Sequence, residues 1–166
     1  VIKFPGPTEG MKTKMESMRR AIKKLPLASK VTCSGAVPGE EVAMFLSNHR
    51  AHDALKQNRL YEMLSCDPDY IDAYGLEVVA GRGFSEGYGD DVNKLVINET
   101  AARMLGYVDN DDAIGEEIAV ETLGEPMQVI GVVKDYHQQA LNKGYTGVML
   151  FHKDKIDWIP QRYISV

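Results

Sequence analysis

The sequence predicts an α+β fold, in which short helices are mixed with strands that are often joined as hairpins. Helical periodicity occurs in separate short segments, whereas strand-sized apolar runs end at Gly, Pro or Asn. The composition fits this class, because 44% hydrophobic and 26% charged residues among 166 allow a folded domain with a buried core. The sequence contains no internal repeat or coiled-coil pattern.

The first part of the chain is predicted to form a β-α-β unit. A short strand at Ile2–Phe4 precedes a helix at Met11–Leu25, and Pro26 ends this helix because a proline forces the preceding residue out of helical geometry. A strand at Lys30–Ser34 completes the unit. The helix is predicted to bury an apolar stripe with spacings of three or four residues, formed by Met11, Met15, Met18, Ile22 and Leu25.

The next segment, residues 35–58, reads as a loop with a short strand at Val42–Leu46. A strand at Arg59–Cys66 follows, with side chains that alternate between its two faces. Asp67 then precedes a proline, which is typical of a helix start, so we expect Asp67 to cap a helix that runs to Tyr74.

The second half contains one capped helix among strands. Asn98 is predicted to cap a helix that extends through Leu105 and ends at Gly106. Two segments around a Gly-Glu-Pro turn are predicted to pair as a hairpin. The predicted strands are Leu76–Ala80, Lys94–Ile97, Glu117–Glu121, Met127–Lys134, Val148–Phe151 and Arg162–Val166.

Charge and cysteine content narrow the functional class. A formal net charge of −5 argues against a nucleic-acid partner, which requires a basic face. The sequence lacks an apolar run near the roughly 20 residues that cross a bilayer, and it begins with Val, so we expect a segment excised from a longer protein. The spacing of Cys33 and Cys66 fits no zinc or redox motif; buried free thiols are favoured, and a disulfide remains the alternative.

Two groups of residues could carry chemistry. His49 and His52 could share a metal ion if they lay on one helix face, but their polar surroundings favour an exposed loop. Asp135 could orient His137 as a general base at the end of a strand, because alternate strand residues share a face. The simpler interpretation is that this strand leaves the core and its polar residues reach solvent. Glycines around Arg82 fit a turn better than a phosphate loop.

Four segments together resemble the MacB-like periplasmic core domain of FtsX/MacB-type ABC transporter permeases. They are Tyr70–Ser85 with its Ala-Gly-Arg-Gly-Phe-Ser end, Val96–Gly106 with Val-Ile-Asn-Glu-Thr-Ala-Ala, Ala113–Ile118, and Ile130–His137 with Ile-Gly-Val-Val-Lys-Asp-Tyr-His. The Tyr-His ending is most similar to large permeases of Bacteroidetes-type bacteria. Residues 40–58 carry none of the family pattern, and the C-terminal part of the family domain is expected to be absent.

The resemblance implies a periplasmic domain inserted between two membrane helices. It implies two lobes, a porter-like β-α-β lobe of residues 1–36 with 159–166 and a mostly β lobe of residues 37–158. It also implies a non-enzymatic role without catalytic residues, metal or cofactor. The domain would couple a cytoplasmic ATPase subunit to export or to partners, namely a periplasmic accessory protein and a second permease copy.

Two alternatives remain open at this point. One is a ligand-binding or sensor module with a pocket between the lobes. The other is a hydrolase that uses His137 with Asp135, or a metal enzyme that uses His49 with His52.

Overall fold

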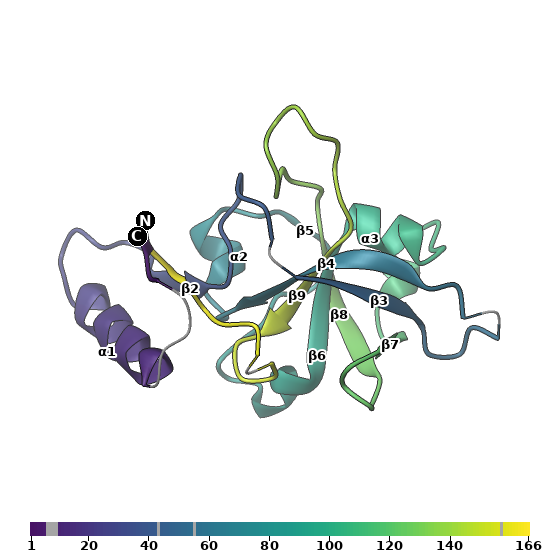
Figure 1. Cartoon of the computed structure of the whole chain (residues 1–166), viewed down its shortest axis with the longest axis horizontal. Helices are drawn as coiled ribbons and strands as arrows, with labels where there is room; N and C mark the ends of the chain where they lie inside the picture. The colour runs from purple at the N-terminus through teal and green to yellow at the C-terminus, as the bar shows by residue number, and fades with distance from the viewer. Residues whose placement is uncertain (6–9, 43, 55, 157) are drawn as a thin grey trace.

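The computed structural model describes residues 1–5, 10–42, 44–54, 56–156 and 158–166, and it confirms the α+β class. Its centre is a barrel-like ring of six strands (Figure 1). Around the ring, β4 pairs with β3, β3 with β7, β7 with β8, β8 with β6, β6 with β9, and β9 again with β4. The strands are β3 Phe45–Arg50, β4 Arg59–Cys66, β6 Lys94–Asn98, β7 Glu117–Val120, β8 Met127–Val133 and β9 Val148–His152.

The largest apolar cluster fills this ring. Because side chains alternate along a strand, one face of each strand points into the barrel, and Met63, Ile97 and Met149 are fully buried there. The opposite face of β4 and β9 forms a second cluster with Tyr70 and Ile71. Parallel pairing of β4 with β9 closes the ring and removes the two edges that an open sheet would expose.

The N-terminal helix lies at one end of the molecule, beside the two chain termini (Figure 1). Strand β1 (Ile2–Lys3), helix α1 (Met11–Lys23) and strand β2 (Thr32–Ser34) occur in the predicted β-α-β order. However, β10 (Tyr163–Ser165) pairs antiparallel with both strands and lies between them. The unit is therefore a split β-α-β arrangement, and its sheet continues into the barrel through β2 and β4.

The remaining elements are short and cover the barrel. Two helices and one strand lie within the segments that resemble the family, and two 3₁₀ helices directly precede β6 and β7 in the chain. They are α2 Tyr70–Ala73, β5 Val78–Gly81, η1 Gly89–Asn93, α3 Glu99–Met104 and η2 Asp111–Ala113. Within the described residues, the helices are too short or too polar to span a bilayer.

The segment at residues 35–58 was wrongly predicted as loop-like. Its second part is β3, which pairs with β4 and β7. The strand predicted at Val42–Leu46 therefore begins three residues before the observed strand begins and ends four residues before the observed strand ends; residue 43 lies outside the described residues. The polar Ser-Asn-His-Arg run hid this strand. Asn48 lies inside the barrel, where its amide nitrogen donates to the Met149 sulfur at 3.3 Å.

The predicted stripe on α1 is only partly correct. Met15 is buried and Met11 and Ile22 pack beside it, but Met18 and Leu25 are exposed. The helix instead buries Arg19, because a cluster of carboxylates surrounds that position.

Two glycines allow close contact between β5 and β8. A Cβ atom at Gly131 would lie 2.0 Å from the Arg82 carbonyl oxygen. Gly81 has φ 65°, as the turn interpretation predicted, and a Cβ there would lie 2.2 Å from the Ile130 carbonyl oxygen.

Candidate functional site

The polar residues that join α1 to the barrel form the candidate site. We call Glu16, Arg19, Asp67, Asp69 and Lys153 the α1–barrel junction. Arg19 and Glu16 lie one turn apart on α1, Asp67 and Asp69 lie between β4 and α2, and Lys153 follows β9. The junction therefore connects the split β-α-β unit to two neighbouring strands of the ring.

Arg19 is the centre of the junction and is only 4% exposed. Its Nε atom lies 2.8 Å from Asp67 Oδ2. One terminal nitrogen, Nη2, contacts Asp69, and the other, Nη1, lies 3.3 Å from Glu16 Oε1. Nε does not meet hydrogen-bond geometry among the described residues, so its pairing with Asp67 is mainly electrostatic. Burial lowers the pKa of Arg19, but the carboxylates of Asp67 and Asp69 outweigh this effect and raise it overall.

Asp67 does not cap α2, so that prediction was wrong. The residue before α2 is Asp69, whose side chain makes no capping hydrogen bond. The fully buried Asp67 carboxylate instead accepts hydrogen bonds from Thr32 Oγ1 at 2.5 Å and from the Cys33 amide at 2.8 Å. Burial raises the pKa of Asp67, and these donors together with Arg19 offset the increase only in part.

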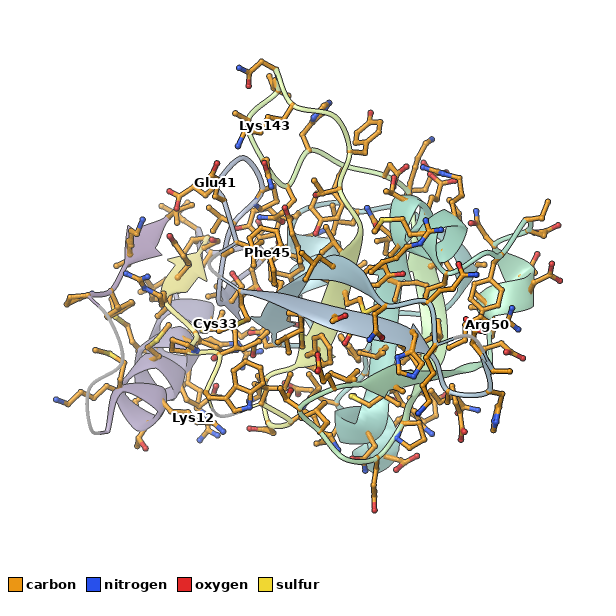
Figure 2. The ribbon with its side chains drawn as sticks, turned by 45° about the vertical axis from the view of Figure 1, so that its right-hand side comes forward. Lys12, Cys33, Glu41, Phe45, Arg50 and Lys143 are labelled. Carbon is orange, nitrogen blue, oxygen red and sulfur yellow. The ribbon has the colours of Figure 1, made fainter. Side chains whose placement is uncertain are left out.

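Further ion pairs surround the junction. Lys153 Nζ lies 3.6 Å from Glu16 Oε2, and Lys12 Nζ lies 3.0 Å from Asp154 Oδ1. Figure 2 labels Lys12 beside the lower end of α1. A groove of about 340 Å³ runs between α1 and the chain after β9; it is lined by Lys12, Thr13, Glu16, Ser17, Arg20, Lys153, Asp154 and Gln161.

The structure directs Asp135 and His137 to different partners. Strand β8 ends at Val133, so the alternation expected of a strand does not continue to these residues. The Asp135 carboxylate accepts hydrogen bonds from the Thr100 amide and hydroxyl, both at 2.8 Å, at the start of α3. The His137 ring lies 4.7 Å from the Tyr145 ring. Asp135 thus holds α3 to the end of β8, a structural role.

His49 and His52 also have separate partners. His49 is on β3 rather than in a loop, and its Nδ1 atom lies 2.7 Å from Asn58 Oδ1. His52 is exposed in the following turn, and its Nε2 atom lies 3.4 Å from Glu117 Oε2. Over the part of the chain that the structure describes, no group of three or more His, Cys, Asp or Glu side chains could hold a metal ion.

Cys33 and Cys66 are free, which confirms the favoured prediction. Ser34, not Cys33, lies opposite Cys66 in the pairing of β2 with β4, so the two thiols face opposite sides of the sheet. Burial raises the pKa of Cys33 to about 12 and raises that of Cys66 well above its usual value. Both thiols are therefore protected from reaction.

Sequence reasoning missed Arg19 and His152 in this region and gave Asp67 the wrong role. Arg19 follows Met15 by four residues on the buried face, a position where a charged residue requires a buried partner. His152, at the end of β9, is buried with its ring edge-on to Phe84. A signal existed only for Arg19, because its position interrupts the apolar stripe.

Comparison with known proteins agrees with this architecture. The family model described as "MacB-like periplasmic core domain" matches residues 5–165. Among curated protein sequences, no relative matches.

Three solved structures share the fold at low sequence identity. The periplasmic region of MacB from Actinobacillus actinomycetemcomitans has a TM-score of 0.64 and 17% identity, covering 97% of this chain and 70% of that one. A permease domain from Porphyromonas gingivalis has a TM-score of 0.60 and 20% identity, covering 88% and 64%. The extracellular domain of the noncanonical ABC-type transporter YknZ from Gram-positive bacteria has a TM-score of 0.61 and 18% identity, covering 98% and 79%.

The family match spans nearly the whole chain, and the three structures show the same fold. The family is one of transporter permeases and is not known as catalytic. An ABC permease works with an ATPase, so such a partner is implied. The chain belongs to the MacB-like periplasmic core domain family and is the periplasmic domain of an ABC transporter permease.

Proposed function

We propose that this domain is a non-catalytic coupler that transmits movement of the permease's membrane helices to its periplasmic surface. In this proposal the domain is inserted between two membrane helices, and ATP hydrolysis by the cytoplasmic ATPase subunit drives their movement. The partners on the periplasmic side are an accessory protein and a second permease copy. The parent is a large permease of the Bacteroidetes type.

The proposal divides the domain into the two lobes predicted from the sequence. Residues 1–36 with 159–166 form the lobe next to the membrane helices, and residues 37–158 form the lobe that meets partners. The observation that carries the proposal is the α1–barrel junction, where Arg19 of one lobe lies among Asp67 and Asp69 of the other.

A buried polar junction suits a coupler because its energy depends strongly on geometry. Charges removed from water are stabilised only while their partners stay in place, so a small rotation of α1 is opposed or redirected through β4 and α2. Such interfaces have a few discrete packed arrangements rather than a continuous range. Lys23 adds a second contact of α1 with Asp69, and Lys30 Nζ lies 2.8 Å from Asp72 Oδ1.

A reversible cross-link across the junction tests the proposal. Lys12 and Asp154, which form an ion pair between the proposed lobes, are replaced by cysteine and joined by a cleavable bis-maleimide in the parent permease. We expect ATP turnover by the partner ATPase to lose its dependence on transport substrate, and to regain it when the linker is cleaved.

The matched control lies within one proposed lobe. Glu77 and Lys134 form an exposed ion pair at 2.8 Å, and the same linker between cysteines there leaves both lobes free to move. Equal effects of the two cross-links would contradict the coupler. ATP hydrolysis by the purified 166-residue chain would also contradict it.

A second candidate is a ligand-binding or sensor module, and the groove beside α1 favours it. A volume of about 340 Å³ between the proposed lobes is large enough for a small ligand, and its lining carries charges of both signs. Thermal-shift measurements with short peptides and lipid headgroups test this role. A ligand in the groove should stabilise the wild type and should fail to stabilise a Lys153→Gln variant.

A further inference from the structure

The loop that joins α1 to β2, residues 24–30, exposes apolar side chains to solvent. Leu27 is 97% exposed and Leu25 is 57% exposed, while Met18 on the same helix is also exposed. A hydrogen bond from the Ala28 amide to the Leu25 carbonyl, at 3.0 Å, folds the loop into a turn that presents both leucines. Isolated surface leucines are common, so the location of these two decides their meaning.

The loop lies at the end of the strands where both chain termini lie. Ile2 pairs with Ile164, and Ser165 pairs with Thr32, so Val1, Val31 and Val166 lie at the same end of β1, β2 and β10. The loop enters β2 at this end, and Figure 1 shows the N and C marks next to each other there.

Lysines flank the two leucines. Lys23 and Lys30 pair with Asp69 and Asp72 respectively. Lys24 is exposed and forms no ion pair among the described residues, so its charge remains available to a partner. Segments that lie in the interface of a membrane place apolar groups below the headgroups and cations beside the phosphates.

We propose that loop 24–30 rests on the periplasmic surface of the lipid bilayer, with Leu25 and Leu27 among the acyl chains and Lys24 beside lipid phosphates. The inference rests on the proposed function, in which the lobe of residues 1–36 with 159–166 lies next to the membrane helices. The loop would fix the height and tilt of the first lobe above the membrane. Movement of the helices would then rotate α1 about this contact rather than displace the whole domain.

Site-directed spin labels can measure this contact. Leu27→Cys carries the label in the parent permease reconstituted in bilayers that contain anionic lipid, and Val108→Cys is the matched control. Val108 is 99% exposed and follows α3, so both positions tolerate a label. Native Cys33 and Cys66 do not compete, because they are buried and burial raises the pKa of each.

The readout compares collisions with oxygen, which concentrates in the membrane, and with a water-soluble nickel chelate. We expect the label at position 27 to favour oxygen severalfold over the label at position 108. In the purified 166-residue chain without lipid, both labels should collide equally with the nickel chelate. An equally aqueous environment at both positions in the bilayer would overturn the proposal, and so would shielding of position 27 from both reagents, which indicates a protein contact.

A second measurement separates the leucines from the lysine. A Leu27→Ser variant should lower binding of the purified chain to vesicles of any charge, whereas Lys24→Gln should lower it only for vesicles that contain phosphatidylglycerol. Equal binding of all three proteins would overturn the proposal. These outcomes are independent of the cross-linking test, because they measure lipid contact and do not depend on ATP turnover.

Discussion

Replacing Arg19 with methionine removes the positive charge from the α1–barrel junction and keeps an unbranched side chain in its place. The substitution leaves Asp67 fully buried without its cation and leaves Asp69 with Lys23 alone. Breaking a buried ion pair by removing one partner costs about 3–5 kcal/mol, because the remaining charge is desolvated and uncompensated. At the lower limit, a domain of this size should melt about 6–12 °C earlier.

Arg20→Met is the matched control, because Arg20 is the next residue on the same helix. Its side chain is 74% exposed and pairs with Glu16 at 3.1 Å, so the expected loss is about 0.5 kcal/mol or less. Urea unfolding, followed by circular dichroism, gives the free energy of unfolding of each variant. Equal stability of Arg19→Met and Arg20→Met would refute the reasoning.

A double variant tests whether the cost comes from the charge. Arg19→Met combined with Asp67→Asn removes both charges of the pair. The amide oxygen can accept the hydrogen bond from the Cys33 amide, and the amide nitrogen can donate to the Thr32 hydroxyl oxygen in place of the bond that Thr32 now donates. We expect the double variant to be more stable than Arg19→Met alone. A further loss instead of a recovery would show that packing, rather than charge, dominates.

Three other predictions follow from buried groups. Burial lowers the pKa of His152, so its neutral form contributes stability above about pH 6.5 that is lost at lower pH, and His152→Gln should reduce the difference in unfolding free energy between about pH 7 and about pH 5. Gly131→Ala should lower the free energy of unfolding by about 1–3 kcal/mol or more and lower the melting temperature, because the added Cβ would meet the Arg82 carbonyl oxygen. Gly144→Ala is its control and should change the melting temperature little, because a Cβ there would meet open space. Asn98→Ala should cost about 2–3 kcal/mol in urea unfolding, because the side-chain oxygen accepts from two buried backbone amides.

Local patterns in the sequence predicted local structure well. Asn98 caps α3 as expected, with its Oδ1 atom 2.9 Å from the Ala101 amide. The predicted hairpin of β7 and β8 is confirmed, with Glu117 opposite Gln128. These features depend on residues close in sequence, where capping and turn chemistry are decisive.

Features that depend on distant residues could not be predicted. The pairing of β4 with β9 and the place of β10 between β1 and β2 bring together segments far apart in sequence. The same limit explains Asp67, since an Asp-Pro pair looks like a helix start until β2 is known to lie beside it. Arg19 is buried for the same reason, because its partners come from another part of the chain.

The antiparallel pairing of β1 with β10 has a mechanical consequence. Val1 precedes and Val166 follows a ladder of only two register pairs, and both ends leave the sheet on the same side. A force that separates these ends would unzip the hydrogen bonds one at a time instead of shearing them together. The ladder therefore resists weakly a force that pulls Val1 and Val166 apart. It transmits a rotation, or a displacement along the strands, of both ends together far better than such a separating force.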